Sequence, residues 1–296
     1  MTISTALQRP PSLQLVKIRD LVYEVAGIFH PDHKLQQLED RCQERMSSLG
    51  AMTLREYYEC LTAKPIRQGE LVRLLNDITV GETYFFRNRP QLDDLRTVVL
   101  TRIVETGKNK GPHHLRIWSA GCSTGEEPYT LSLILMEELA GRLRGWTFEI
   151  VATDLNERSV AYAKVGRYGS YSTRDLTRQI TQKYFNPCDE GLRLNNEVKT
   201  HVSITRVSLL DDALMVLLKG FDIITCCNVL IYFDVLSKQR VIRHFYNSLL
   251  PHGYLFLGYS ESLYGVSRDF HLVHLPSSTG YVKSNKRSSP QLEDSL

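Results

Sequence analysis

RIWSAGCSTGEEPYTLSL, residues 116–133, is the stretch that decides the fold of this 296-residue chain. Its first half predicts a buried strand that ends at Ala120, and its second half predicts a helix that begins near Glu126. Gly121 and Gly125 lie in the loop between them, where glycine permits a tight turn and a close approach of the backbone to a ligand. The stretch is therefore either a ligand-binding strand–loop–helix or an ordinary strand-to-helix turn.

The charges of this stretch argue against a phosphate site. The loop has neither the GxGxxG pattern nor a Walker lysine, and the predicted helix opens with Glu126 and Glu127. Two carboxylates would repel a pyrophosphate, but they can bind hydroxyl groups or a cationic amino group. The loop thus favours a ligand that carries such groups.

The sequence on either side of this stretch predicts two unlike domains. After residue 112, short apolar runs alternate with helical patterns, which predicts an α/β domain with a mostly parallel sheet covered on both faces. Before residue 90, apolar residues recur three or four apart, as in small antiparallel helices, and Thr53 followed by Glu56 predicts a capping box. The expected parts are a flexible arm at 1–11, a helical domain at 12–90, the sheet domain at 91–283 with an antiparallel insertion at about 184–204, and a disordered tail at 284–296.

The composition is that of an ordinary globular protein, with 42% hydrophobic and 23% charged residues. A formal charge of +3 is too small to indicate nucleic acid as a partner, and no apolar run predicts a membrane span or a signal peptide. The six cysteines show no CxxC pair, so we expect reduced thiols in the cytosol and no structural metal site.

Polar residues end two further predicted strands. Asp154 closes the strand in VATDLN, where an acidic residue of an open α/β sheet can bind ribose hydroxyls, although a strand-end Asp is also a common helix cap. The spacing from Gly121 to Asp154 is longer than the spacing of about 20 residues in a dinucleotide fingerprint, which argues against a dehydrogenase. Asn228 follows the apolar run 221–226, and Tyr232 lies close behind it as either a flat wall of the pocket or a core aromatic.

The segment TYFFRNRP, residues 83–90, joins the helical region to the sheet region. Thr83 and Arg87 are four residues apart and would share a helix face, from which Arg87 can pair with a carboxylate. An Arg beside aromatic residues is also a common surface or packing residue, so both interpretations remain open.

Taken together and in order, these segments resemble the CheR family of chemotaxis-receptor methyltransferases. The resemblance covers about residues 70–283 and rests on the segments TYFFRNRP, IWSAGCSTGEEPYTLSL, ATDLNERSVAYAKVGRY, KYF, CNVLIYF and GYLFLGYSESL. It implies a Rossmann-like, S-adenosylmethionine-dependent methyltransferase domain with a small inserted antiparallel β-subdomain, preceded by a small all-α domain. It also implies S-adenosylhomocysteine as the product and the cytoplasmic domain of a methyl-accepting chemoreceptor as the partner.

The resemblance implies roles for the residues that match its motifs. Arg87, Asn228 and Tyr232 are expected to form the methyl-transfer corner, where a glutamate side chain of the receptor is esterified. The expected cofactor contacts are Thr83, Arg87, Gly121, Gly125, Glu126, Asp154, Asn228 and Val229, together with Ser208 and Leu209 beside the adenine.

Two positions depart from the family pattern. The family commonly has Asn where this chain has Gly81, and often Arg where it has Cys227. These departures support a second hypothesis, a cofactor-binding but catalytically weak module that regulates a signalling pathway. A methyltransferase acting on nucleic acid or a small molecule is a third, and the nearly balanced charge and the lack of an Asn-Pro-Pro-Tyr signature argue against it. We expect a cytoplasmic enzyme that neither binds nucleic acid or metal nor inserts into a membrane.

Overall fold

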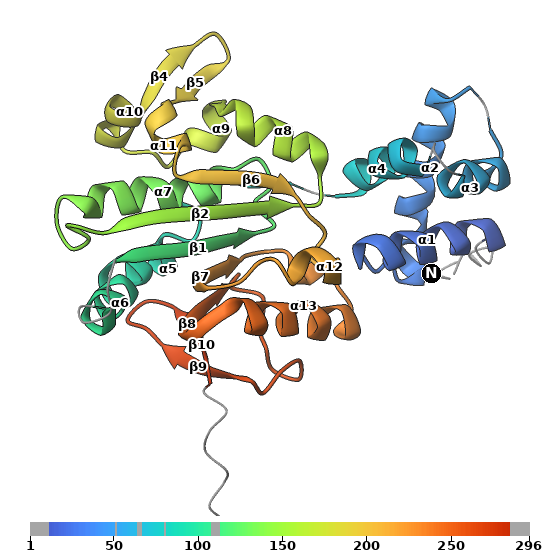
Figure 1. The fold of residues 1–296 in the computed structure, drawn as a ribbon. Coiled ribbons are helices and arrows are strands. Elements are labelled where there is room, and N and C mark those ends of the chain that lie inside the picture. The colour runs from blue at the N-terminus through green and yellow to red at the C-terminus, as the bar shows by residue number, and fades with distance from the viewer. Residues whose placement is uncertain (1–11, 51, 64–66, 80, 108–112, 285–296) are drawn as a thin grey trace, which may run out of the picture. The chain divides into compact units, whose positions relative to one another are not determined.

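The computed structural model describes residues 12–50, 52–63, 67–79, 81–107 and 113–284, which fall into two compact units, Met1–Val80 and Gly81–Leu296 (Figure 1). The expected arm at 1–11 and all but the first residue of the expected tail lie outside the described residues. The units divide ten residues before the boundary expected after residue 90, because Phe85 and Phe86 pack into hydrophobic clusters of the second unit. No helix of the described residues is long and apolar enough to cross a membrane.

The first unit is all-helical, as the spacing of its apolar residues predicts. The predicted capping box is confirmed: the Thr53 hydroxyl accepts from the backbone N–H of Glu56 at 3.2 Å, and the Glu56 carboxylate accepts from the backbone N–H of Thr53 at 2.8 Å. Leu15, Ile18 and Leu38 are fully buried on the predicted apolar faces. The elements are α1 (Leu13–Ala26), η1 (Asp32–Lys34), α2 (Leu35–Ser48), α3 (Leu54–Thr62) and α4 (Arg67–Ile78).

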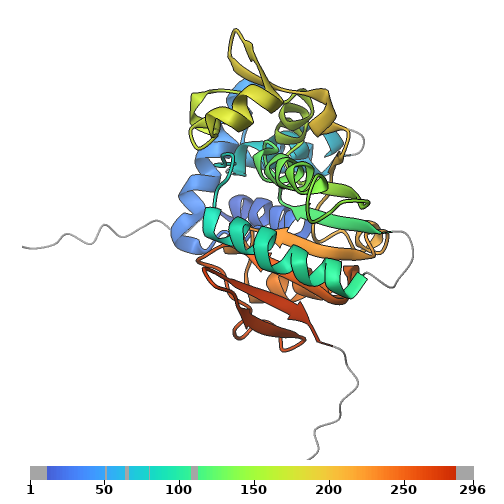
Figure 2. The same cartoon turned by 90° about the vertical axis from the view of Figure 1, so that its left-hand side faces the viewer.

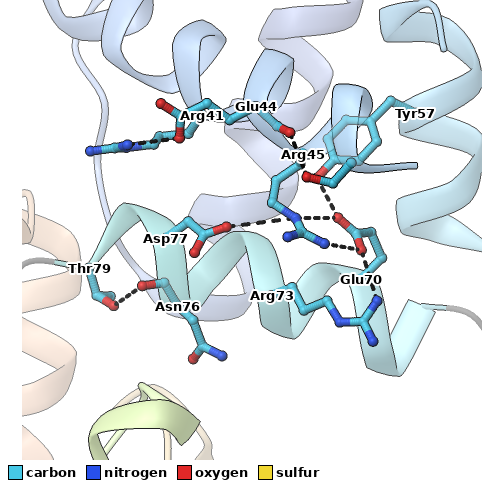
Figure 3. Close-up of polar contacts among 10 residues, drawn as sticks. Arg41, Glu44, Arg45, Tyr57, Glu70, Arg73, Asn76, Asp77 and Thr79 are labelled. Carbon is cyan, nitrogen blue, oxygen red and sulfur yellow. Dashed lines mark hydrogen bonds and ion pairs between the residues drawn. The ribbon is translucent and has the colours of Figure 1, made fainter. Parts of the chain in front are cut away.

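Three helices of this unit meet at a buried carboxylate, that of Glu70 on α4 (Figure 3). Arg45 of α2 donates from Nε and Nη2 to its two oxygens, both at 2.8 Å, and the Tyr57 hydroxyl of α3 donates to it at 3.1 Å. The guanidinium of Arg73 lies 3.6 Å away. Because Glu70 is only 2% exposed, this bidentate pairing supplies the counter-charge that a buried carboxylate needs.

The second unit is built on a seven-stranded sheet in the order β6-β2-β1-β7-β8-β10-β9. The first five strands in that order run parallel, and β10 pairs antiparallel with both of its neighbours, β8 and β9, so the predicted mostly parallel sheet is confirmed. Its strands are β1 (His114–Ala120), β2 (Thr147–Asp154), β6 (Val202–Arg206), β7 (Phe221–Cys226), β8 (Leu249–Leu257), β9 (Phe270–His274) and β10 (Thr279–Lys283).

Helices pack against both faces of this sheet. On one face Trp118 and Ile224 pack in a cluster with Phe245 of the last helix, and on the other Ile117 packs in a cluster with Leu131. This double covering explains why the strands read as nearly continuous apolar runs. The helices are α5 (Arg89–Asp94), η2 (Leu95–Val99), α6 (Leu100–Gly107), α7 (Glu126–Leu139), α8 (Glu157–Val165), α9 (Ser170–Thr173), α10 (Arg178–Tyr184), α11 (Asn196–Lys199), α12 (Asp212–Met215), η3 (Leu230–Tyr232) and α13 (Val235–Ser248).

A separate antiparallel sheet, in the order β3-β5-β4, interrupts the second unit. Its hairpin, β4 (Phe185–Cys188) and β5 (Gly191–Leu194), lies within the expected insertion at 184–204, but β3 (Arg167–Tyr168) comes from upstream of it. The end of the expected insertion belongs instead to β6, which pairs parallel with β2. In both views the hairpin lies at the opposite end of the unit from β9 and β10 (Figures 1 and 2).

Candidate functional site

The sheet reverses its strand order at β1, which has β2 on one side and β7, the strand reached much later in the chain, on the other. In open α/β sheets, ligands bind at the carboxyl ends of the strands beside such a reversal. Three predicted features follow these strands: the glycine loop after β1, Asp154 at the end of β2, and Asn228 after β7. The structure therefore brings them to one edge of the sheet.

The loop after β1 is packed directly against the loop after β7. Gly121 has φ +77°, and a Cβ built on it would lie 2.3 Å from Cγ2 of Val229. Gly125 has φ +96°, and a Cβ there would lie 2.8 Å from the Cβ of Ala163 on α8. Both positions combine a left-handed backbone with a lack of space, so only glycine fits without rearrangement.

Asp154 fixes this glycine loop from the end of β2. Its Oδ2 accepts from the backbone N–H of Ser123 at 2.7 Å, and its Oδ1 accepts from the backbone N–H of Asn156 at 2.8 Å. Burial raises the pKa of the Asp154 carboxyl, and these backbone donors act in the opposite direction. Each carboxylate oxygen has a second lone pair, so the role of Asp154 in binding ribose stays open as a prediction.

The two adjacent carboxylates at the start of α7 have different surroundings. Glu126 is only 1% exposed and accepts from the hydroxyls of Thr124 at 2.6 Å and Ser172 at 2.8 Å. Glu127 is half-buried and accepts from the hydroxyls of Ser119 on β1 at 2.7 Å and Thr225 on β7 at 2.5 Å. Burial raises the pKa of both carboxyls.

Glu127 is a candidate site residue that the expected cofactor contacts do not include, although the sequence pointed to both carboxylates at the start of this helix. It bridges the two strands at the reversal point, its polar partners among the described residues are all neutral, and part of its surface stays exposed. The sequence carries a partial signal, because Ser119 and Thr225 are hydroxyl residues near the carboxyl ends of their strands, but it does not show which carboxylate they bind. The Glu126 side chain, which the sequence singled out, is closed off instead between its own loop and α9.

The segment with Thr83 and Arg87 does not form the expected shared helix face. Residues 81–84 are not helical and 85–88 form a turn, because Phe86 and Asn88 have φ of +58° and +61°. The backbone N–H of Phe85 donates instead to the carbonyl of Ser172 at 2.9 Å. Thr83 and Arg87 thus lie in an irregular segment that hydrogen bonds hold to the rest of the second unit.

Arg87 nevertheless interacts electrostatically with Tyr232. Arg87 donates from Nη1 to the carbonyl of Glu82 at 2.5 Å, and its guanidinium lies 5.8 Å from the centre of the Tyr84 ring. Burial raises the pKa of the Tyr232 hydroxyl, and the positive charge of Arg87 lowers it. The positive charge of Arg87 thus influences the tyrosine, and the methyl-transfer corner expected for the two residues stays a prediction.

Residues with left-handed backbone gather in the loops of this site. Among the described residues, the non-glycine positions with positive φ are Phe86, Asn88, Ser123, Asn228 and His252. All but His252 belong to three of the segments singled out from the sequence, which are 83–90, 116–133 and the segment that follows 221–226. Such conformations are costly and concentrate where a site needs them, so their grouping supports a functional role for this edge.

Ser208 and Leu209 follow β6, next to the end of β2. The backbone N–H of Val207 donates to the carbonyl of Asp154 at 2.9 Å, which fixes the start of this loop beside the carboxylate. Leu209 is 7% exposed and packs in the cluster that also contains Leu230. Their expected place beside an adenine ring stays a prediction.

Two family models match the chain. One is described as CheR methyltransferase, all-alpha domain, and covers residues 13–79; the other is described as CheR methyltransferase, SAM binding domain, and covers residues 81–279. The chain belongs to the CheR family. Chemotaxis protein methyltransferase 2 of Vibrio cholerae is 34% identical to it over 93% of this chain and 94% of that protein. The chemotaxis protein methyltransferase of Escherichia coli is 32% identical, with 86% of each chain covered.

The second unit is thus the S-adenosylmethionine-binding domain of a CheR methyltransferase, and its residues fit that cofactor chemically. S-adenosylmethionine carries ribose hydroxyls, a cationic amino group and a carboxylate. Asp154 can accept from hydroxyls, Glu127 lacks a cation among its described partners, and Arg87 is a cation for a carboxylate. No group of three or more His, Cys, Asp or Glu side chains in the described part of the chain is arranged to hold a metal ion.

The two departures from the CheR pattern both lie at this edge. A Cβ on Gly81 would lie 2.8 Å from Oγ of Ser123, which donates to the Gly81 carbonyl at 3.0 Å. A larger residue at Gly81 would therefore require the Ser123 side chain to move. Cys227 places a neutral thiol beside Glu127, and its Sγ lies 3.5 Å from Oε1 of Gln91 on α5.

Proposed function

We propose that this CheR-family enzyme transfers the methyl group of S-adenosylmethionine to glutamate side chains on the cytoplasmic domain of a methyl-accepting chemoreceptor. The observation that carries the proposal is the convergence of the glycine loop, Asp154, Glu127 and Asn228 at the strand-reversal edge of a CheR-family domain. We place the protein in the cytoplasm because such a substrate is found there.

In this proposal each polar residue of the site has one task. Asp154 accepts from the ribose hydroxyls, Glu127 binds the amino group, and Arg87 orients a carboxylate. Thr83, Gly121, Gly125 and Val229 complete the surroundings of the cofactor, with Ser208 and Leu209 beside its adenine. The buried Glu126 side chain supports the loop through Thr124 and Ser172 and does not touch the cofactor. Asn228 and Tyr232 shape the corner in which the substrate glutamate lies.

In this reaction the protein has to align the substrate carboxylate with the methyl group and does not have to transfer a proton. A glutamate carboxylate is already ionised near neutral pH, so it can act as the nucleophile without a general base. The bound cofactor supplies an electrophilic methyl group on a sulfonium. Holding the carboxylate in line with that methyl group and excluding water can contribute roughly 7–11 kcal/mol to lowering the barrier.

The first test is isothermal titration of the protein with S-adenosylmethionine and S-adenosylhomocysteine. We expect micromolar binding of both, weakened at least tenfold in Asp154→Ala. Asp222→Ala is the matched control, because Asp222 also accepts from a backbone N–H, that of Arg116 at 2.9 Å, but lies at the opposite end of β7. Failure of both compounds to bind would refute the cofactor site.

The second test is transfer of a radiolabelled methyl group to fragments of chemoreceptor cytoplasmic domains. Label that base hydrolysis releases as methanol identifies a carboxyl methyl ester and supports the proposal. Binding of the cofactor without transfer to any receptor fragment would favour the regulatory module instead, a reading that the neutral Cys227 beside Glu127 keeps open.

A further inference from the structure

Glu261 connects two loops of the site through a single carboxylate. It lies in the loop after β8, and its Oε2 accepts from the backbone N–H of Gly258 at 2.7 Å and of Asn228 at 2.8 Å. Its Oε1 accepts from the backbone N–H of Ile231 at 3.3 Å. Three backbone donors, two of them in the loop after β7, thus depend on one side chain.

The loop after β7 needs such a restraint. Asn228 has φ +63°, a left-handed conformation that Asn adopts more readily than most residues but that still costs free energy, so contacts from the surroundings help to maintain it. The three-residue helix η3 that follows is too short to hold itself, and Ile231 on it is 49% exposed. The hydrogen bonds that Glu261 accepts fix the backbone of this loop at Asn228 and at Ile231, the residue immediately before Tyr232.

Gly258 shows how closely the two loops approach. A Cβ built on Gly258 would lie 2.8 Å from Oε2 of Glu261 and 2.9 Å from the backbone nitrogen of Asn228. The backbone N–H of Glu261 also donates to the Gly258 carbonyl at 2.9 Å, which closes the turn that aims the carboxylate. Glycine at this position therefore allows Glu261 to reach across to the loop after β7.

We infer that Glu261 is a positioning residue of the methyl-transfer site, which holds Asn228 and Tyr232 in place by accepting from the backbone of their loop. The inference rests on the proposed function of that loop. Glu261 itself is not expected to touch the methyl group or the cofactor. Its effect arises because a displacement of about 1 Å in an aligning residue can reduce the rate roughly a hundredfold.

Three substitutions of Glu261 distinguish the effect of its hydrogen-bond acceptors from the effect of its negative charge. Glu261→Gln keeps one oxygen that can accept from Asn228 and Gly258, Glu261→Asp keeps the charge but is one methylene too short, and Glu261→Ala removes every acceptor. We expect kcat to fall about tenfold or less in Glu261→Gln and about 30- to 100-fold in Glu261→Asp and Glu261→Ala. If the negative charge acted instead of the geometry, Glu261→Asp would be the mildest change, and that order would overturn the inference.

Two further measurements distinguish positioning from simple stabilisation. Hydrogen exchange of the Asn228 and Gly258 amides should accelerate at least tenfold in Glu261→Ala, while the Kd for S-adenosylhomocysteine changes less than about threefold. Asp222→Ala, which removes a carboxylate acceptor from the opposite end of the sheet, should lower the melting temperature without lowering kcat.

The inference and the proposed function fail separately. An inactive wild-type protein would refute the proposed function, whereas the accelerated exchange of the two amides would still be expected. An active wild-type protein whose kcat is unchanged in Glu261→Ala would refute the inference alone. Unchanged amide exchange in Glu261→Ala would also refute it, because the hydrogen bonds would then not restrain the loop.

Discussion

Glu70 in the helical unit and Glu127 in the sheet unit are both carboxylates withdrawn from water, but among the described residues only Glu70 has a cationic partner. Glu70 is 2% exposed and accepts two bonds from Arg45 and one from Tyr57. Glu127 is half-buried and accepts from two neutral hydroxyls, those of Ser119 and Thr225. The hydrogen bonds of Glu70 thus include a cation, whereas those of Glu127 within the described residues include none.

This difference separates a structural carboxylate from one that is suited to a ligand. A buried charge with a well-placed partner stabilises the fold only as long as the partner is present. A carboxylate surrounded by neutral donors is less stable in its ionised form, and a bound cation would compensate it. The charge of Glu70 therefore has its partner within the helical unit, and the surroundings of Glu127 support the proposed role of its charge in binding the cofactor.

The largest effect should come from breaking the Glu70 pair. Arg45→Met removes the bidentate partner, which we expect to lower the free energy of unfolding by about 3 kcal/mol in urea denaturation. The double variant Arg45→Met/Glu70→Met removes both charges and should recover most of that loss. If the double variant is as unstable as the single one, packing and not charge holds this cluster together.

A smaller and different effect is expected at Glu127. Glu127→Gln keeps the shape but removes the charge, so S-adenosylmethionine should bind roughly 30-fold more weakly, a loss of about 2 kcal/mol. The free energy of unfolding should change by less than about 1 kcal/mol, since the Ser119 and Thr225 hydroxyls can rotate to suit the amide. Titration calorimetry and urea denaturation of the same variant measure both quantities.

Glu126→Gln is the matched control for Glu127→Gln, because its carboxylate lies one residue away and also accepts from two hydroxyls. A smaller loss of affinity than in Glu127→Gln is expected, since Glu126 is closed off from a ligand. The comparison of Glu70 with Glu127 breaks down if Glu127→Gln destabilises the fold as much as Arg45→Met does.

The smallest effect should be the dependence of cofactor affinity on pH. Burial raises the pKa of Glu127, so this group takes up a proton at a higher pH than an ordinary glutamate does. As the pH falls through that pKa, Glu127 loses its negative charge, and the affinity for the cationic amino group should decrease. The stability of the cofactor-free protein should change in the opposite direction. A raised pKa in the folded state means that stability increases as pH falls through that pKa toward the unfolded value.

The difference between wild type and Glu127→Gln isolates this group from Asp154 and Glu126, whose pKa values burial also raises. We expect calorimetric titrations over a pH series to show a steeper loss of affinity in wild type than in the variant. Parallel pH profiles of the two proteins would mean that Glu127 does not bind the cation.

The start of α7 shows what the sequence could predict about the site and what it could not. The glycine loop, the start of the helix and the strand before it follow from local patterns, and the structure confirms them. Adjacent residues on a helix point about 100° apart, so the choice between Glu126 and Glu127 depends on which strands lie opposite. Thr225, which donates to Glu127, lies 98 residues away in the chain, and no local pattern could reveal that pairing.

The sequence by itself determined the two unlike domains, the mostly parallel sheet, the capping box at Thr53 and the CheR family, because apolar periodicity, turn chemistry and family motifs are local properties. Only the tertiary structure decided the strand order that brings three loops to one edge, the left-handed turn around Arg87, and the reach of Glu261 to Asn228. These depend on contacts between distant segments, where the backbone donors of one loop find their acceptors on another.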